Sequence, residues 1–220
     1  MGELIVVEGI DGAGKRTLSA RLVDAWRRSG LSVATAAFPR YGQSVHADLG
    51  AEALRGGHGD LVDSVYAMAL LWALDRRDFG ERLRALQEDH DVVLLDRYVA
   101  SNAAYGAARL GESPDGQFAR WVHALEFDRF ALPVPDRQLL LAVPVEVARE
   151  RAGRREAEDA DRARDAYERD ADLQSRVADV YAALAFAGWG APWEVTGPGT
   201  DGVGVDALAA ELVGRVRGPG

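Results

Sequence analysis

The sequence predicts an α/β fold in which helices cover both faces of a mostly parallel sheet. Short apolar runs alternate with longer segments of helical periodicity, as expected where each strand is followed by a crossover helix. The apolar runs cover residues 4–8, 33–38, 92–95, 138–143 and 193–196. The helical patterns lie near residues 15–29, 60–88, 99–110, 115–130, 144–188 and 205–217. Because open α/β sheets bind ligands at the carboxyl ends of their strands, the residues after each run are the first site candidates.

A glycine-rich loop follows the first apolar run and precedes the first helical pattern. It reads Gly9, Ile10, Asp11, Gly12, Ala13, Gly14, Lys15, Arg16 and Thr17. A strand, a loop of this kind and a helix N-terminus form a phosphate-binding loop. Glycines let the backbone wrap closely around an anion, and the helix N-terminus and Lys15 add positive charge. The segment therefore predicts binding of nucleotide phosphates.

Arg16 departs from the phosphate-loop pattern, which places a magnesium-binding Ser or Thr directly after the lysine. The hydroxyl must then come from Thr17, or the metal must be held elsewhere. A chance glycine-rich turn is the alternative, but the strand before the loop and the helix after it favour a phosphate site. A dinucleotide-binding loop would need a third glycine where Thr17 stands.

Length and charge are those expected of one enzyme domain spanning residues 1–220. The chain has 26 Lys and Arg against 35 Asp and Glu, a formal net charge of −9. This acidic balance argues against a nucleic-acid partner and makes local clusters of arginine informative. The sequence has no cysteine, which excludes disulfides and thiolate metal sites and is compatible with the cytoplasm. No apolar run reaches about 18 residues, so we expect no membrane span.

Polar segments follow the second and third strands. The proline in segment 38–41 fixes a turn that aims Arg40 in a defined direction. An aspartate that ends a buried strand beside a phosphate loop, such as Asp96, is the usual place for a magnesium-organising carboxylate. Arg97 could pair with Asp96 or reach a phosphate. An ordinary structural ion pair is the alternative, which becomes less attractive because both segments lie at strand ends of one sheet.

Two helical faces carry candidate ligand contacts. Ser101, Asn102 and Tyr105 share one face of the helix after the third strand, and Trp72 and Arg76 share a face of an earlier helix. The residues alone suggest a base stacked on Trp72 and a monophosphate held by Arg76. The alternative is a core tryptophan with Arg76 paired to a nearby acid, which is the commoner arrangement for a buried ring.

The segment 149–169 has the highest density of charge, with seven arginines among acidic residues. Such runs are usually solvated helix surface. Gly153 and the acidic stretch 156–161 suggest instead two helices with a mobile joint. An arginine-rich flap over a phosphate loop would be a lid that excludes water and brings positive charge to the transferred group. Asp165 and Glu168 are three residues apart and lie on one side of this segment, with Tyr167 between them.

Taken together, the glycine-rich loop, the Phe-Pro-Arg and Asp-Arg-Tyr segments, Ser101 with Tyr105, and the arginine lid resemble the thymidylate kinase family over nearly the whole chain. The resemblance implies the three-layer P-loop NTPase fold, with a five-stranded parallel sheet flanked by helices and a lid at about residues 149–165. It implies transfer of the γ-phosphoryl group of MgATP to dTMP, giving dTDP and ADP for dTTP synthesis. It also implies a homodimer.

The resemblance assigns expected roles to residues of this sequence. ATP would bind to Gly9, Asp11, Gly12, Ala13, Gly14, Lys15, Arg16 and Thr17. The expected dTMP contacts are Phe38, Pro39, Arg40, Tyr41, Trp72, Arg76, Arg97, Ser101, Asn102, Tyr105 and Tyr167. The expected catalytic residues are Lys15, Arg97, Asp11 and Arg155.

Within that set the implied roles are specific. Arg97 would bridge the donor and acceptor phosphates, and Arg40 would hold the dTMP phosphate with help from Tyr41. Arg76 would contact the base, which Trp72 would stack against, in place of the phosphate role suggested by the residues alone. Asn102 would contact the pyrimidine edge, and Tyr105 would crowd the 2′ position of the sugar. Arg155 would supply the lid charge, because the loop has glycine at position 12 where other family members carry arginine.

Two departures from the family pattern bear on the site. Trp72 stands where a phenylalanine is usual, and Arg16 removes the usual magnesium hydroxyl. We expect that Mg²⁺ is held by Asp11 together with Asp165 or Glu168.

Two other functions compete with this interpretation. A deoxynucleoside kinase would use Glu8 as the base that deprotonates a sugar hydroxyl, but Arg40 would then have no acceptor phosphate to bind. A nucleotide-gated switch of the GTPase kind would need an Asn-Lys-x-Asp segment, which does not occur in the sequence.

Overall fold

The computed structural model describes residues 1–158, 166–197, 207 and 209–210. Its strands are β1 (Glu3–Glu8), β2 (Val33–Ala37), β3 (Val92–Asp96), β4 (Arg137–Leu141) and β5 (Trp193–Thr196). The longer helices are α1 (Lys15–Arg28), α2 (Val45–Leu54), α3 (Val65–Asp89), α4 (Val99–Leu110), α6 (Val145–Glu158) and α8 (Ala171–Ala187). The shorter ones are η1 (Leu61–Asp63), α5 (Gln117–His123), the π-helix η2 (Ala124–Arg129) and α7 (Ala166–Arg169).

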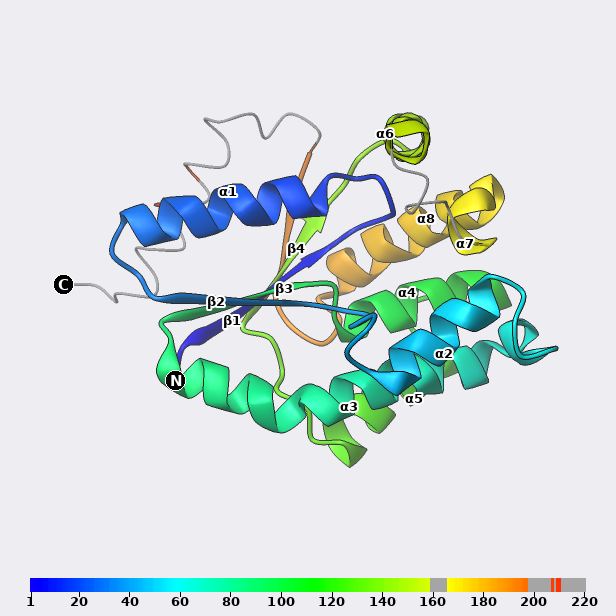
Figure 1. Cartoon of the computed structure of the whole chain (residues 1–220), viewed down its shortest axis with the longest axis horizontal. Coiled ribbons are helices and arrows are strands. Elements are labelled where there is room, and N and C mark those ends of the chain that lie inside the picture. Colours follow the sequence, from blue (N-terminus) through cyan, green and yellow to red (C-terminus); the bar gives the residue numbers. More distant parts are fainter. Residues whose placement is uncertain (159–165, 198–206, 208, 211–220) are drawn as a thin grey trace.

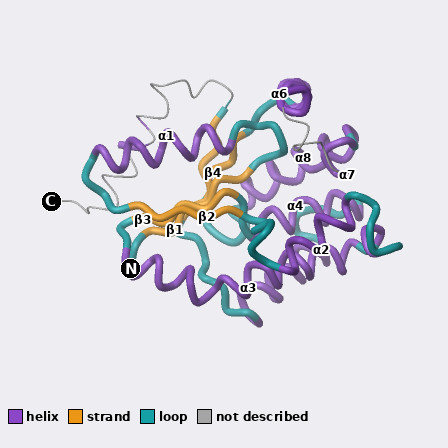
Figure 2. Tube along the Cα trace, in the orientation of Figure 1, coloured by secondary structure: helices purple, strands orange, loops and turns teal. Residues whose placement is uncertain are grey.

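In the described part of the chain, five strands form one parallel sheet in the order β2-β3-β1-β4-β5. Val7 of β1 lies opposite Asp96 of β3 and Leu139 of β4. This register brings the carboxyl ends of the central strands to one edge, where the loops that follow β1 and β3 meet. Figure 1 shows α1 on one face of the sheet and α3 on the other, and Figure 2 shows the strands enclosed between helices. The predicted α/β class and five-stranded parallel sheet are confirmed.

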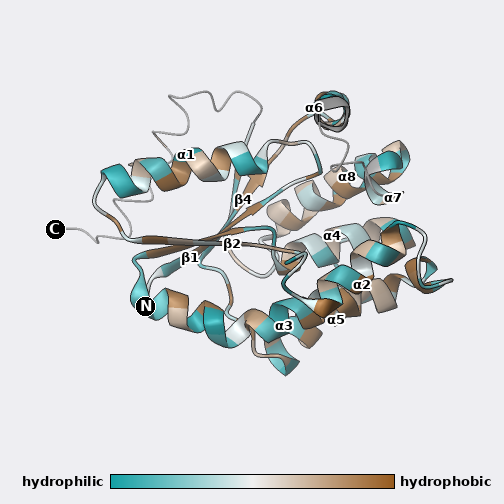
Figure 3. Cartoon of the chain, viewed as in Figure 1, coloured by the Kyte–Doolittle hydropathy of each residue, from teal (hydrophilic) through white to brown (hydrophobic). Residues whose placement is uncertain are grey.

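The core lies where the apolar strands meet the helices on both faces. Leu4, Ile5, Val6 and Val7 are fully buried, as is Trp26 of α1. A strand covered on both sides is buried on both faces, which is why residues 4–7 of β1 form a continuous apolar run in place of an alternating pattern. Figure 3 shows hydrophobic and hydrophilic stretches alternating along the covering helices. None of the described helices combines the length and the apolar character needed to cross a membrane.

Several element boundaries differ from those expected. β2 ends at Ala37 and β4 at Leu141, earlier than expected. The pattern near 60–88 divides into η1 and α3 at Ser64, whose hydroxyl caps α3 by accepting a bond from the backbone N–H of Ala67. The pattern near 115–130 is α5 followed by η2. A helix over residues 205–217 lies largely outside the described residues.

The sequence did not predict α2, because most of its buried face consists of small residues. Ala47, Gly50 and Ala53 are buried, and only Leu54 on that face is large. A joint was expected over Gly153 and the acidic stretch 156–161. At Gly153 this expectation is wrong, since α6 continues through it to Glu158, and residues 159–161 lie outside the described residues. Residues 159–165 of the expected lid lie outside the described residues.

Candidate nucleotide site

The glycine-rich loop connects β1 to α1 and contacts α6. Gly9, Gly12 and Gly14 have φ angles of 143°, 78° and 104°, values that residues with a Cβ seldom adopt. A Cβ at position 12 would lie 2.1 Å from the carbonyl oxygen of Ala148 in α6. Glycine is therefore required at this position both for the backbone conformation and for the close approach of α6.

Lys15 is buried at the start of α1, and its ammonium group points back into the loop. Nζ donates to the carbonyl oxygens of Gly9 at 3.1 Å and Ile10 at 3.0 Å. Burial and the nearby charge of Arg97 lower the pKa of Lys15 to about 8, against smaller opposing effects of neighbouring acids. The ammonium group therefore lies against the loop that the sequence predicts to bind phosphate.

Asp11 and Arg97 form an ion pair that joins the loop to the carboxyl end of β3. Arg97 Nη2 lies 2.5 Å from Asp11 Oδ1, and the Tyr105 hydroxyl donates to Asp11 Oδ2 at 2.5 Å. Burial would raise the pKa of Asp11, but the charges of Arg97 and Lys15 and the two hydrogen bonds hold it well below its usual range. Arg97 thus pairs with Asp11 and not with its neighbour Asp96, and the backbone of Arg97 adopts a left-handed φ of 67°.

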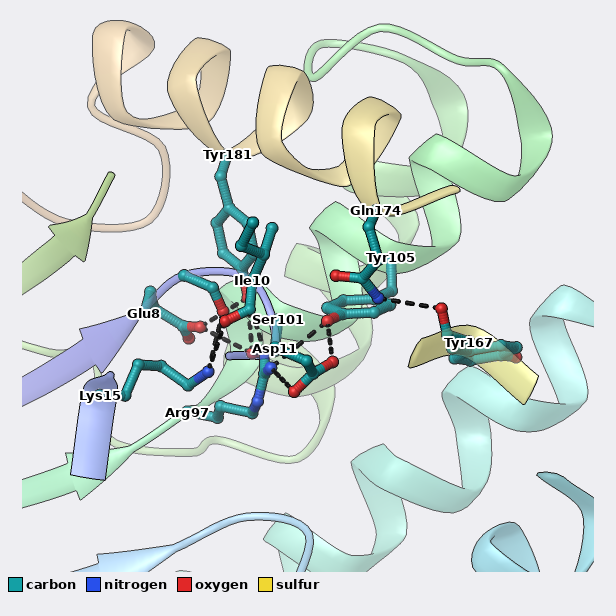
Figure 4. A network of polar contacts seen from close by, with 11 residues as sticks. Glu8, Ile10, Asp11, Lys15, Arg97, Ser101, Tyr105, Tyr167, Gln174 and Tyr181 are labelled. Atoms are coloured by element: carbon teal, nitrogen blue, oxygen red, sulfur yellow. Dashed lines mark hydrogen bonds and ion pairs between the residues drawn. The ribbon is translucent and has the colours of Figure 1, made fainter. Parts of the chain in front are cut away.

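Glu8, fully buried at the end of β1, organises the residues around Arg97 (Figure 4). It accepts hydrogen bonds from the backbone N–H of Tyr98 at 2.9 Å, the Ser101 hydroxyl at 2.6 Å and the Tyr181 hydroxyl at 2.8 Å. Arg97 Nη1 in turn donates to the hydroxyls of Ser101 and Tyr181, both at 3.2 Å. Tyr181 comes from α8, far along the chain, and no motif in the sequence pointed to it.

Arg40 is held in place beside α3. Its Nε donates to Asp75 Oδ1 at 2.9 Å, its backbone N–H to Asp75 Oδ2 at 2.9 Å and its Nη2 to the Asp75 carbonyl at 3.0 Å. The guanidinium lies 4.9 Å from the centre of the Phe79 ring. The preceding Phe38–Pro39 peptide bond is cis. Asp75 therefore fixes Arg40 as a positioned cation at the end of β2.

Trp72 and Arg76 both have protein partners. The Trp72 ring packs against Gly50 of α2, where a Cβ would lie 2.2 Å from the indole, and Tyr41 meets the ring edge-on at 6.4 Å. Arg76 is buried and forms a two-point ion pair with the buried Glu126, which raises the pKa of Arg76 against the effect of burial. The paired-arginine alternative thus describes Arg76 in this structure.

Ser101, Asn102 and Tyr105 all lie on α4, the helix that follows β3. Ser101 and Tyr105 contact Arg97, while the Asn102 amide nitrogen donates to the carbonyl of Ala69 and to Glu126, both at 2.9 Å. Tyr167 of α7 stacks on Tyr105 with ring centres 6.1 Å apart. Their contacts therefore extend from the phosphate loop to Glu126.

The arginine-rich helix α6 lies on the phosphate loop. Arg151 Nη1 donates to the carbonyl of Ala13 at 2.9 Å. A pocket lies between this helix, the loop and the start of α8; its lining includes Asp11, Arg149, Arg169 and Gln174. Three expected site groups lie outside the described residues, namely Asp165 and the side chains of Arg155 and Glu168. Arg16 and Thr17 are exposed at the start of α1.

A parallel sheet of this order, with a glycine-rich loop between β1 and α1 and paired charges at its carboxyl edge, defines a P-loop protein that binds nucleoside phosphates. Residues 7–190 match the sequence model of the family described as thymidylate kinase. A thymidylate kinase of Mycobacterium tuberculosis is 59% identical over 198 residues, which cover 90% of this chain and 92% of that protein. The chain belongs to the thymidylate kinase family.

More distant relatives cover most of their own length as well. A thymidylate kinase of Akkermansia muciniphila is 34% identical, with coverage of 98% of this chain and 90% of the relative. A probable thymidylate kinase of Thermococcus gammatolerans is 32% identical, with coverage of 84% of each chain.

Proposed function

We propose that this protein is a phosphotransferase that moves the γ-phosphoryl group of ATP to dTMP, giving dTDP and ADP. The observation that carries the proposal is the position of Arg97. Its guanidinium is held by Asp11 of the phosphate loop and by Ser101 and Tyr105 of α4. A cation at this junction can contact both the transferred group and the phosphate that accepts it.

The chemistry requires alignment and charge neutralisation and needs no general base. The phosphate of dTMP has a second pKa near ~6, so one of its oxygens is already an anionic nucleophile at neutral pH. That oxygen attacks the γ-phosphorus, the bond from the γ-phosphorus to the β–γ bridging oxygen breaks, and ADP leaves. Lys15 and Arg97 stabilise the negative charge spread over the transferred group, while Arg40 holds the acceptor phosphate.

Asp11 fits the role of a magnesium ligand. Its pKa is held below the usual range, so the carboxylate is ionised at neutral pH, and Mg²⁺ prefers carboxylate and phosphate oxygens. When bound with ATP, Mg²⁺ would neutralise phosphate charge. Thr17, exposed at the start of α1, is the alternative protein ligand. Roles for Asp165 and Glu168 stay predictions from the sequence.

A deoxynucleoside kinase is the main competing function, and the surroundings of Glu8 argue against it. The carboxylate is fully buried and accepts three hydrogen bonds from Tyr98, Ser101 and Tyr181. A general base must instead reach the proton of the substrate hydroxyl. Glu8 is therefore a structural acceptor in this arrangement.

The test is a coupled assay of ADP formation from ATP, with dTMP, dCMP, dAMP, dGMP and thymidine offered as separate acceptors. We expect dTMP to be the best acceptor, with thymidine inactive. Phosphorylation of thymidine alone would establish the deoxynucleoside kinase. ADP formation with none of the acceptors would favour a nucleotide-gated switch.

We also propose that the enzyme acts as a homodimer in the cytoplasm. Exposed apolar side chains on α3 support an interface there: Tyr66 and Leu70 lie one turn apart and are 38% and 39% exposed. Light scattering on the purified protein tests the dimer, and a monomer mass at assay concentration would contradict it.

A further inference from the structure

A buried carboxylate, Glu126, lies behind the side chains expected to contact the base. It is fully buried in η2, the π-helix that continues α5. In this segment the N–H of Phe130 bonds to the carbonyl of Leu125 at 2.9 Å. The partner lies five residues earlier in the chain, where an α-helix would use the residue four positions earlier. Single π-helical turns are rare and are frequent at functional sites.

Glu126 joins α3 to α4 through both of its carboxylate oxygens. Oε2 accepts from Arg76 Nε at 2.5 Å, and Oε1 accepts from Arg76 Nη2 at 2.7 Å and from Asn102 Nδ2 at 2.9 Å. Arg76 and Glu126 are 3% and 0% exposed. A single acid therefore fixes two side chains of the expected acceptor site.

The contacts of Asn102 determine which way its amide faces. Nδ2 donates to the carbonyl of Ala69 and to Glu126, and both of these partners can only accept. The nitrogen must face them, so Oδ1 lies on the opposite side of the amide. Within the described residues, no hydrogen bond to Oδ1 is found. Asn102 therefore presents a hydrogen-bond acceptor.

Arg76, in contrast to Asn102, presents hydrogen-bond donors. Nε and Nη2 of Arg76 donate to Glu126. Among the described residues, no partner of Nη1 is found, so its N–H groups are left for a ligand, and a guanidinium can only donate. Trp72, the ring one turn earlier on α3, lies on the same face. The pair Arg76 and Asn102 thus offers donors and an acceptor side by side.

We propose that Glu126 is a positioning residue that sets the base preference by holding Asn102 as an acceptor and Arg76 as a donor. The proposal rests on the proposed function, because it concerns the base of the dTMP acceptor. Thymine and uracil present a donor at N3 and an acceptor at O4, which match this pair. Cytosine presents an acceptor at N3 and a donor at N4, so both contacts would be mismatched.

The test compares dTMP and dCMP as acceptors for Glu126→Gln in the full chain at saturating ATP. Glutamine has one acceptor oxygen and one donor nitrogen and no negative charge. It therefore cannot accept all three bonds, and the hold on Arg76 and Asn102 is weakened, with the Ala69 carbonyl still facing the Asn102 amide. We expect the ratio of kcat/KM for dTMP to kcat/KM for dCMP to fall by at least about tenfold. The change should lie mainly in KM for the acceptor, with KM for ATP unchanged.

Glu3→Gln is the matched control. Glu3 accepts from Arg137 Nε at 2.8 Å at the opposite end of β1, so the substitution weakens a less buried carboxylate–arginine pair away from the site. The control should keep the wild-type ratio. A wild-type ratio in folded Glu126→Gln would overturn the proposal, whereas absence of dTMP phosphorylation by the wild-type protein would overturn the proposed function.

Loss of a buried partner can also unfold a protein, so circular dichroism must accompany the assay. If Glu126→Gln is unfolded, Glu126→Asp decides the question. Aspartate keeps a negative charge beside Arg76, but its shorter side chain cannot reach both Arg76 and Asn102. The dTMP to dCMP ratio should again fall by at least about tenfold, and an unchanged ratio would overturn the proposal.

Discussion

In the protein without substrates, Lys15 loses its proton more readily than an ordinary lysine does. The ammonium is buried and lies near the guanidinium of Arg97, so its pKa falls to about 8. Within the part of the chain that the structure describes, it donates hydrogen bonds to two carbonyl oxygens and to no carboxylate. A bound phosphate would add negative charge and raise that pKa again. Proton binding and ATP binding should therefore favour each other at this residue.

The resulting prediction concerns pH. The protonated form of Lys15 binds ATP, and in the free enzyme this form is lost as the pH rises through about 8. We expect kcat/KM for ATP to fall by about tenfold per pH unit above that value, while kcat stays level to higher pH. Initial rates between about pH 6.5 and 9.5 test this, with kcat/KM for dTMP at saturating ATP as the control. A constant kcat/KM for ATP over that range would contradict it.

Arg97 can be tested by deletion of its charge. Arg97→Ala should lower kcat by about 100-fold or more, because it removes a cation from the transferred group. Arg137→Ala is the control, since Arg137 pairs with Glu3 and Glu194 at the other end of the sheet. Near-normal turnover in Arg97→Ala would mean that Arg97 serves only as the structural partner of Asp11.

The sequence pointed to residues of the proposed site wherever a local pattern carried the information. Lys15 and Asp11 belong to the glycine-rich loop, and Arg97 follows a buried strand. Tyr181 and Glu126 could not be found in this way. The hydroxyl of Tyr181 meets Glu8 across 173 residues of sequence, and Glu126 meets Arg76 only because η2 packs against α3. Such contacts arise from tertiary packing, for which one sequence has no local signal.

At the scale of elements, the fit of α2 against α3 depends on a glycine. A Cβ at position 50 would lie 2.2 Å from the indole of Trp72. The large ring in α3 is therefore accommodated by the absence of a side chain in α2. Gly50 supports the position of Trp72, and hence of the surface expected to stack against the base.

Gly50→Ala should displace Trp72 and raise KM for dTMP by about threefold to tenfold, with a stability loss of about 1–3 kcal/mol from overpacking. Trp72→Phe supplies a smaller ring that leaves room for the added methyl. We therefore expect KM for dTMP in the double variant to be close to that of Trp72→Phe alone. Steady-state kinetics and thermal unfolding of the three variants measure this coupling. Additive effects would show that the two residues act independently.

Element types were predictable where the apolar periodicity was strong, and boundaries were not. All five described strands overlap the predicted apolar runs, because both faces of the sheet are covered. The boundary between η1 and α3 at Ser64 depends on a side-chain cap. The buried face of α2 consists mostly of small residues such as Ala47 and Gly50, so it gives no apolar periodicity. In each of these cases tertiary contacts, and not local pattern, decide the structure.

At the scale of the whole molecule, an acidic protein has to concentrate positive charge at one place to bind two anionic substrates. The net charge is −9, yet Lys15, Arg40 and Arg97 lie at the carboxyl edge of the sheet, and Arg151 of α6 bonds to the loop there. The contact between α6 and the loop is thus part of the proposed site. It depends on the contact between Gly12 and Ala148.

Gly12→Ala tests whether the ATP site needs this contact between α6 and the loop, with Gly188→Ala as the matched control. Both glycines have left-handed φ angles, 78° and 64°, so alanine costs about 1–2 kcal/mol of backbone strain at either position. At position 12 the added methyl meets the Ala148 carbonyl at 2.1 Å, whereas at position 188 no atom of the described residues lies within 4 Å. We expect both variants to melt earlier and Gly12→Ala alone to lose kcat/KM for ATP, by about tenfold or more, because the loop and α6 must separate. Equal kcat/KM values for ATP in the two variants would show that the loop tolerates displacement of α6. In that case α6 would have no part in forming the ATP site.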